Sequence, residues 1–346
     1  MCHYRLHFGP WLHSQLRPLT WKNAMCLRWR EADSAWLPRR VADETGSSGS
    51  GRRWHAYSGC TMRGDQRRAE FKAIAAENEA VLSRGFYQHP ETGSVATETA
   101  VQRAVRATRS YAPQDLSWLL ADLPNRDARA RTRFEVTSET SLQAALRLKS
   151  KGHGTVGVLN FASATKPGGG YLTGATAQEE DLCRCSALYR SLLQAGEYYA
   201  AHHRHRDPFY SHRVIYSPGV PVFRDHNYAL LPAPYLASFL SCPAPNAGEI
   251  VGESPERLAQ IRGVLAARSA MILAVAVHNH VGSLVLGAWG CGVFRNAPGE
   301  VAAAFKTHLT SGGQFASYFD HIVFAVYDRT PARSNLAAFR SAFEEG

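Results

Sequence analysis

The stretch TVGVLNFASATKPGGGYLTGATAQEEDL, residues 155–182, contains the features that decide the fold. It opens with an apolar, β-branched run, which is typical of a buried strand. Three consecutive glycines at 168–170 then allow the backbone a tight loop, and the acidic sequence QEE follows at 178–180. Acidic residues commonly occupy the first turn of a helix, so the stretch predicts a strand, a glycine loop and a helix in that order.

The flanking sequence alternates strand and helix patterns, which predicts an α/β fold. RTRFEV at 131–136 is a strand pattern, and SETSLQAALRLKSKG at 138–152 is a helix with a Ser/Thr start and a basic, glycine-terminated end. With the strand of the opening stretch they form a strand–helix–strand unit, so we expect the two strands to pair in parallel. Further helices are expected at 68–85, 178–199, 255–279, 300–311 and 335–345, a strand followed by a proline-rich bend at 213–223, and strands at 283–289 and 321–328. The order favours a three-layer α/β/α sandwich.

Residues 1–62 differ from the remainder in composition. They hold nine Lys/Arg and four Asp/Glu, and five of the seven tryptophans, without a helical or strand period. ETGSSGSGRR at 44–53 has the composition of a flexible linker. We interpret 1–62 as a poorly ordered basic extension, with a partner-binding arm as the alternative, and 63–346 as the folded domain.

Charge and cysteine content limit the partners and the compartment. The net charge of +10 favours polyanions by electrostatic steering, but half of it lies in 1–62, so no duplex nucleic-acid surface is predicted. Seven cysteines without a C-x-x-C pair indicate reduced thiols in the cytoplasm or nucleus, and the acid-free start leaves organellar transit open. No apolar run approaches the ~20 residues of a membrane span. A monomer without membrane contact is expected.

Two glycine-bearing loops are predicted at the carboxyl ends of strands, where α/β sheets bind ligands. The first is at 168–170, and the second is GCGVF at 290–294. Backbone N–H groups in such loops bind phosphate without Lys or Arg, so two facing loops suit a diphosphate. Each loop alone is weak evidence, because glycine turns after strands are common.

Glu179 and Glu180 lie beside the first loop. Acids at the start of a helix complement its dipole, and this structural interpretation explains one or two of them. It does not explain their position next to a phosphate-sized loop. A carboxylic acid near a glycosidic oxygen can protonate a leaving group, so the combination indicates cleavage of a sugar bond in a nucleotide-diphosphate ligand.

The motif GGG, seven residues, then QEE resembles the signature of the microbial-type poly(ADP-ribose) glycohydrolases. Four further segments resemble the same family in order: RAEFKAIAAENEAVLSRGFY at 68–87, YSPGVPVFRD at 216–225, LVLGAWGCGVFRN at 284–296 and HIVFAVYD at 321–328. The resemblance covers about 63–345. It implies a macrodomain-like sandwich with a mixed sheet, an N-terminal helical accessory segment, and a catalytic domain at 63–346.

The resemblance also implies roles for individual residues. Glu180 matches the catalytic acid of the family, and Glu179 the neighbour that holds the ribose. The implied ligand-binding residues are Asn160, Ser163, Gly168, Gly169, Gly170, Gln178, Gly290, Gly292, Val293 and Phe294. Lys166 stands where many members carry Asn, which replaces a ribose contact by a side chain able to reach a phosphate.

The implied activity is hydrolysis of the ribose–ribose O-glycosidic bond of poly(ADP-ribose), which releases ADP-ribose. The substrates are the polymer or ADP-ribosylated proteins, and neither cofactor nor metal is expected. The alternatives are a module that binds ADP-ribose without cutting it and a hydrolase of another ADP-ribosyl linkage, such as a protein ester. The intact glutamate pair favours an enzyme. His202, His203, His205 and His212 are interpreted as solvated, because they lack acidic or Cys companions at metal-ligand spacing.

Overall fold

The computed structural model describes residues 55–124 and 131–344, with side chains from residue 64 onward. The basic segment 1–54 lies outside the described residues, so its interpretation as a poorly ordered extension stays a prediction. The first element is the helix α1 (His55–Arg84). The expected boundary at residue 63 therefore falls inside this helix.

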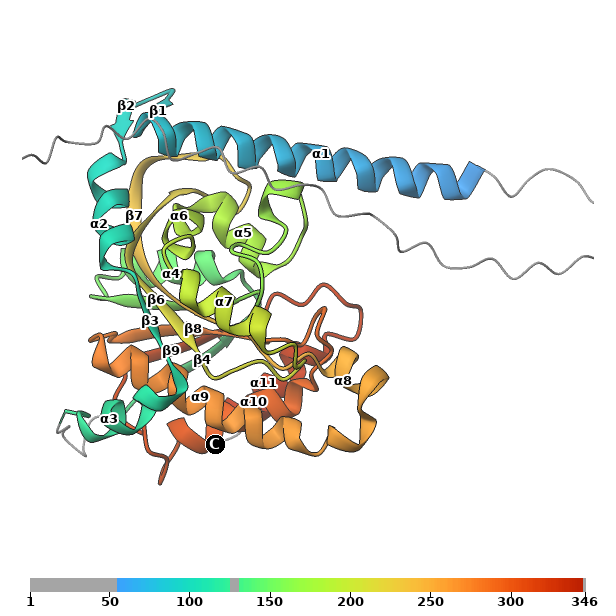
Figure 1. Ribbon diagram of the computed structural model, residues 1–346. Coiled ribbons are helices and arrows are strands. Elements are labelled where there is room, and N and C mark those ends of the chain that lie inside the picture. The colour runs from blue at the N-terminus through green and yellow to red at the C-terminus, as the bar shows by residue number, and fades with distance from the viewer. Residues whose placement is uncertain (1–54, 125–130, 345–346) are drawn as a thin grey trace, which may run out of the picture. The chain divides into compact units, whose positions relative to one another are not determined.

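A seven-stranded mixed sheet forms the centre of the part of the chain that the structure describes (Figure 1). In spatial order its strands are β3 (Arg109–Tyr111), β6 (Val214–Arg224), β7 (Leu230–Cys242), β5 (Val156–Phe161), β8 (Ser283–Leu286), β9 (His321–Ala325) and β4 (Arg133–Thr137). The strands from β7 to β4 are parallel, whereas β3 pairs antiparallel with β6, and β6 with β7. A separate hairpin, β1 (Phe86–His89) and β2 (Gly93–Ala96), follows α1.

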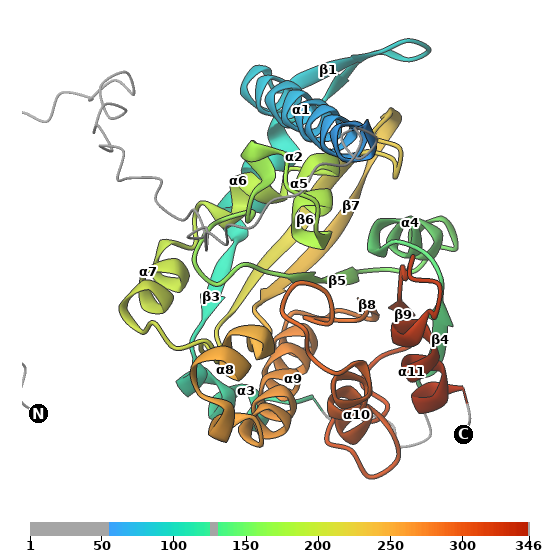
Figure 2. The same ribbon diagram turned by 90° about the vertical axis from the view of Figure 1, so that its right-hand side faces the viewer.

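Helices cover both faces of this sheet, which confirms the three-layer sandwich (Figure 2). One layer contains α2 (Glu98–Ala107), α4 (Ser141–Ser150), α5 (Gln178–Cys185) and α6 (Leu188–Leu192), with α1 packed on α2 and α5; the other contains α3 (Leu116–Ala121), α9 (Gln260–His278), α10 (Pro298–Leu309) and α11 (Ser334–Phe343). The short helices α7 (Gly196–Arg204) and α8 (Ala247–Glu253) follow α6 and β7. Two clusters of buried apolar side chains hold the layers together, one around Leu148 and Leu188 and one around Met271 and Phe305.

The strands β4 and β5 are parallel but do not pair, so the predicted pairing is wrong. β4 pairs with β9, and β5 pairs with β7 and β8, which leaves β8 and β9 between the two. The local strand–helix–strand unit determines the relative direction of its strands. The strands that lie between them, β8 and β9, come much later in the chain. A local sequence pattern therefore cannot predict that they separate β4 from β5.

The single helix expected over 178–199 is three short helices, α5, α6 and α7. The chain breaks at Ser186, whose backbone is extended (φ −145°, ψ 176°) and forms an antiparallel bridge with Val222 of β6. The next N–H, of Ala187, donates to Pro221 O (3.0 Å). The apolar helical period of the sequence continues across Ser186 and therefore does not predict the break. The break is caused by the bridge to the sheet, which lies outside the helix.

The strand β6 continues through the segment where a proline-rich bend was expected. Its register with β7 shifts between Ser217 and Val220, a β-bulge at which Gly219 takes φ 57°. The long strand β7 was not predicted. Its prolines Pro232 and Pro234 argue against a strand by sequence, but they lie where the β6–β7 register is irregular and no ladder donor is needed.

The helix α9 has the length and apolar composition of a membrane span, contrary to the expectation that no segment approaches one. In the domain, 67% of that apolar window is buried. Contacts with β6, β7 and α10 account for this burial. A helix that is covered on several sides needs apolar residues around most of its circumference, so its composition follows from its place in the core.

Candidate active site

The carboxyl ends of β5, β7 and β8 meet at one edge of the sheet, because these strands are parallel neighbours. The loop after β5 (162–177) carries the triple glycine, and the loop after β8 (287–297) carries the second glycine motif. The carbonyl oxygen of Cys242, the last residue of β7, accepts hydrogen bonds from Ala162 N (3.2 Å) and Trp289 Nε1 (2.9 Å). One carbonyl thus ties both loops together, which confirms that they share this edge.

The triple-glycine loop turns back onto the start of α5. Gly168 and Gly169 have φ values of 66° and 57°, a left-handed backbone that favours glycine. A Cβ atom at Gly169 would overlap Glu180 Oε1 and lie 3.2 Å from Glu179 Oε2. The loop therefore encloses the two carboxylates directly, and glycine is required there even before a ligand binds.

Glu180 is buried in the first turn of α5, with 7% of its surface exposed. Its Oε1 accepts a hydrogen bond from Gly170 N (2.8 Å), so the glycine loop fixes the carboxylate. The other oxygen, Oε2, has no hydrogen-bond partner among the residues that the structure describes. Glu180 is held at one oxygen and keeps the other for a ligand or a water molecule.

Glu179 is bound by the protein at both carboxylate oxygens. Oε1 accepts from Asn160 Nδ2 (3.2 Å), and Oε2 accepts from Ser163 N (2.7 Å). Burial raises the pKa of Glu179 to about 8, and the charge of Glu180 adds to the increase. The N–H groups of Ser163 and Gly168 and the Asn160 amide oppose it but do not offset it. Glu179 is therefore mostly neutral at pH 7.

Gln178 and Asn160, two of the expected ligand-binding residues, hold the site in place. Gln178 Nε2 donates to Leu159 O (2.8 Å), and its Oε1 accepts from Phe161 N (2.9 Å), which attaches the start of α5 to the end of β5. The Asn160 side chain is fully buried behind Glu179. The bonds that the structure shows are positioning contacts, and a direct ligand contact of either residue stays a prediction.

The second glycine loop is closed by an asparagine that the sequence reading did not single out. Asn296 is buried, and its Nδ2 donates to Gly290 O (3.0 Å) and Pro245 O (2.8 Å). Gly290 has φ 73°, and Gly292 and Val293 form the exposed tip of the loop. At 80% exposure, the Val293 side chain makes little contact with its own domain and is available to a ligand. The sequence signal for this role is the position of Asn296, a polar residue that closely follows the glycines of the second loop.

Phe294 stands beside the same edge. Its ring lies 6.0 Å from that of Tyr210, centroid to centroid, and Tyr210 itself takes a left-handed backbone with φ 56°. The carbonyl of Phe294 accepts from Gly248 N at the start of α8 (3.0 Å). Phe294, the aromatic residue expected against the ribose, is thus positioned by Tyr210 and by the start of α8. Tyr210 is a second aromatic ring beside this edge of the sheet.

His202 is buried, so its interpretation as a solvated histidine is wrong. Its Nδ1 donates to Tyr198 O (2.9 Å), and its Nε2 accepts from Ser211 N (3.1 Å). Burial lowers its pKa to about 4, so the ring is neutral at pH 7. His203 and His205 are exposed, and within residues 64–124 and 131–344 no three His, Cys, Asp or Glu side chains gather as metal ligands would.

The helix α1 supports the glycine loop from behind. Tyr171, directly after the glycines, is buried, and its hydroxyl lies 3.3 Å from Ala75 O and 3.4 Å from Glu79 Oε1. Asn78 is fully buried, and its Nδ2 donates to Arg184 O near the end of α5. One face of α1 therefore contacts both the loop and the helix that carry the site, which the apolar spacing of α1 did not reveal.

Comparison with known proteins agrees with this geometry. Residues 75–225 match the family model of the microbial-type PARG catalytic domain. The poly(ADP-ribose) glycohydrolase of Thermomonospora curvata is 49% identical, with a TM-score of 0.77, over 80% of this chain and 100% of that one. The structure of the same enzyme bound to the inhibitor ADP-HPD is 48% identical over the same shares, with a TM-score of 0.75.

The poly(ADP-ribose) glycohydrolase of Deinococcus radiodurans, in complex with ADP-ribose, is also similar. It is 44% identical, with a TM-score of 0.68, over 71% of this chain and 97% of that one. No curated protein matches the chain. The chain belongs to the microbial-type poly(ADP-ribose) glycohydrolase family, as the GGG and QEE motifs suggested.

Proposed function

We propose that this protein hydrolyses the ribose–ribose O-glycosidic bond of poly(ADP-ribose) and releases ADP-ribose, with Glu180 as the general acid and base. The observation that carries the proposal is the unequal environment of the two glutamates. Glu179 is bound at both oxygens, whereas Glu180 is bound by Gly170 N at one oxygen only. A group that transfers a proton needs a free oxygen that can reach the substrate.

The glycine loops bind the diphosphate of the terminal ADP-ribose unit. In the second loop the N–H groups of Gly292, Val293 and Phe294 have no acceptor among the residues that the structure describes, and such groups bind phosphate without a cation. In the first loop the N–H groups of Gly169 and Gly170 donate to Lys166 O (3.0 Å) and Glu180 Oε1 (2.8 Å), so its glycines contribute close backbone approach to the ligand. Phe294 packs against the ribose, and Val293 covers the phosphates from the exposed tip of the second loop. Substrate binding in this orientation places the ribose–ribose bond over the first turn of α5.

Glu180 donates its proton to the departing ribose 2′-oxygen as the bond to the anomeric carbon breaks. Water then adds its oxygen to that carbon, and the ionised Glu180 takes the proton that the water loses. No cofactor or metal takes part in these steps.

Glu179 acts as a positioning residue that limits the negative charge of the site. A second full charge beside Glu180 and the substrate diphosphate would repel the ligand. With a pKa of about 8, Glu179 keeps that charge off the pair at pH 7. Its bonds to Asn160 and Ser163 also fix the start of α5 relative to the end of β5.

The proposed substrates are free poly(ADP-ribose) and ADP-ribosylated proteins, cleaved by a monomer in the cytoplasm or nucleus. Cys183, Cys185, Cys242 and Cys291 are free thiols, which supports a reducing compartment. Elution volume in size-exclusion chromatography tests the monomer, and a dimer at micromolar concentration would contradict it.

Incubation of the full chain with labelled poly(ADP-ribose), followed by separation of the products by size, tests the activity. Release of free ADP-ribose is expected. A protein that binds the polymer without shortening it would be a reader, and release only from protein-linked mono(ADP-ribose) would indicate a different linkage. Either outcome contradicts the proposal.

A further inference from the structure

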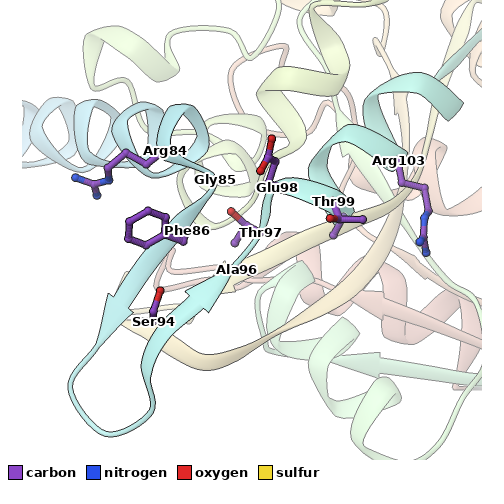
Figure 3. A pocket seen from close by; sticks show the side chains of 10 residues that line it. Arg84, Gly85, Phe86, Ser94, Ala96, Thr97, Glu98, Thr99 and Arg103 are labelled. Atoms are coloured by element: carbon purple, nitrogen blue, oxygen red, sulfur yellow. The ribbon is translucent and has the colours of Figure 1, made fainter.

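Away from the glutamate pair, the end of α1, the β1–β2 hairpin and the start of α2 line a pocket of about 520 Å³ (Figure 3). This volume is within the range of small-molecule sites in proteins. None of its residues has a part in the proposed reaction. The chemistry of its wall indicates what it can bind.

The first turn of α2 directs unused hydrogen-bond donors into this pocket. Thr97 precedes the helix and is 1% exposed, yet its side chain makes no capping bond and its hydroxyl has no partner among the described residues. Figure 3 places that side chain between Phe86 and Glu98. The N–H groups of Thr99 and Ala100 also lack an acceptor within the described part of the chain. A buried unpaired hydroxyl next to free N–H groups is a ready site for an anion.

Two arginines flank these donors. Arg84 and Arg103 line the pocket, both are exposed, and neither forms an ion pair within residues 64–124 and 131–344. The positive end of the α2 dipole adds to their charge. Glu98 also lines the pocket, but its carboxylate accepts from Gln102 Nε2 (2.9 Å) one turn along the helix. The balance of charge around the free donors is positive, which suits a phosphate group.

Phe86 supplies the apolar part of the pocket wall. Its ring is 37% exposed, and the Arg84 guanidinium lies 6.0 Å from the ring centroid. Exposed aromatic rings beside cations are platforms on which nucleic-acid bases stack. A phosphate site next to such a ring fits an adenosine phosphate, and the Glu98 carboxylate can accept from a ribose hydroxyl.

We propose that this pocket binds an internal ADP-ribose unit of the polymer whose end occupies the glutamate site. The inference rests on the proposed function, because it takes the polymer as the substrate. A second contact along one chain raises the local concentration of polymer ends at the active site. Long polymers then bind more tightly than short ones without any change at the catalytic residues.

The test uses the full chain with Glu180→Gln, which prevents cleavage of the ligand during the measurement. Fluorescence anisotropy measures its affinity for long polymer, for a two-unit oligomer and for ADP-ribose. The same affinities are measured after the further substitutions Arg84→Ala/Arg103→Ala. The double substitution is expected to weaken long-polymer binding about 10-fold and leave ADP-ribose binding unchanged, since only the second contact is lost. The slope of log affinity against log salt falls by about 1 to 2, the loss of two phosphate contacts. The matched control, Arg262→Ala/Arg340→Ala, removes the same charge from α9 and α11 and leaves both quantities unchanged.

Thr97→Val separates a ligand contact from a role in the fold. It keeps the shape of the side chain and removes a buried hydroxyl that the protein leaves unpaired, so the melting temperature does not fall. Long-polymer binding is expected to weaken by a few-fold nonetheless. A structural role alone would lower the melting temperature and leave polymer binding unchanged.

Equal long-polymer affinity in the arginine variant and its control overturns the inference. Titration with free ADP tests whether the pocket binds a free nucleotide instead. If the arginine variant loses a second ADP site but binds long polymer normally, the occupant is a free nucleotide and the inference is overturned. Failure of the proposed function gives a different result. Wild-type protein would then leave the polymer intact, and the arginine variant would still bind long polymer more weakly than its control does.

Discussion

At the scale of single residues, Glu179 and Glu180 are neighbours in sequence with opposite surroundings. Hydrogen bonds from the protein engage both carboxyl oxygens of Glu179, while Glu180 keeps one oxygen free beside the glycine loop. Adjacent residues on a helix point about 100° apart, which allows one side chain to face the β5 strand end and the other the loop. The proposed division between a positioning residue, Glu179, and a proton donor, Glu180, follows from that rotation.

Glu180→Gln is expected to lower the rate of polymer cleavage by ~10²–10⁴-fold, the range of a lost general acid, while ADP-ribose still binds. The amide keeps the shape of the side chain but cannot transfer the proton. Initial rates with labelled polymer, and calorimetry with ADP-ribose, measure the two effects. The control is Glu256→Gln, an exposed glutamate outside the site, which keeps the wild-type rate. Cleavage at the wild-type rate by Glu180→Gln would show that another group is the acid.

Glu179 is expected to make the stability of the protein depend on pH. The unfolded chain ionises this group near 4.5, whereas the folded chain retains the proton up to a pKa of about 8. Because the folded state then binds more protons, the contribution of Glu179 lowers the free energy of unfolding as pH rises from about 4.5 to about 8, and is constant above that.

Glu179→Gln removes this dependence. Relative to the wild type, the variant is expected to gain stability between pH 5 and pH 8.5, by up to on the order of 4 kcal/mol. Urea unfolding of both proteins at the two pH values measures the difference. An unchanged difference between wild type and variant would mean that Glu179 is ionised in the folded protein.

At the scale of elements, the position of the glycine loop depends on α1, which comes long before it in the chain. The hydroxyl of Tyr171 lies within hydrogen-bond distance of Ala75 O and Glu79 Oε1, and Tyr171 directly follows Gly170, whose N–H binds Glu180. A single residue therefore links α1 to the proposed acid. Loosening this link moves the loop without removing any group that contacts the substrate.

Tyr171→Phe is expected to lower kcat by about 3- to 10-fold, with a smaller change in KM. The magnitude is that of one lost hydrogen bond of about 1 kcal/mol, and the ring still fills its place. Steady-state kinetics on polymer separate the two constants. Tyr189→Phe is the matched control, because its ring packs 5.2 Å from that of Tyr171 while its hydroxyl has no hydrogen bond within the described residues. Equal kinetics in the two variants would contradict a positioning role for the Tyr171 hydroxyl.

At the scale of the whole molecule, every residue of the proposed site lies in or after α1. Deletion of residues 1–54 is expected to leave the affinity for ADP-ribose within about two-fold of the full chain, since every site contact that the structure describes lies after residue 54. The cut belongs before His55 rather than at residue 63, because the later cut shortens α1. Calorimetry on both proteins tests this. A folded truncated protein that no longer binds ADP-ribose would place a ligand contact in 1–54.

Much of the site could be read from the sequence because its motifs are local. The strand, the triple glycine and the QEE sequence lie within 28 residues, and the chemistry of a tight loop beside helix N-terminal acids depends on residue type and spacing alone. The same holds for the second loop, where GCGVF follows a strand. The family resemblance of these segments is confirmed by the comparisons.

The sequence by itself determined the alternating α/β class, the strands β4, β5, β8 and β9 and the two glycine loops, because each depends on neighbours a few residues apart. Only the tertiary structure decided which strands pair, that Ser186 breaks a helix, and that Tyr171 and Asn296 hold the loops. The physical reason is that strand pairing and burial are set between segments far apart in the chain. The same reason explains the pKa of Glu179, since its burial, the largest cause of the increase, exists only after α5, β5 and the glycine loop have packed together.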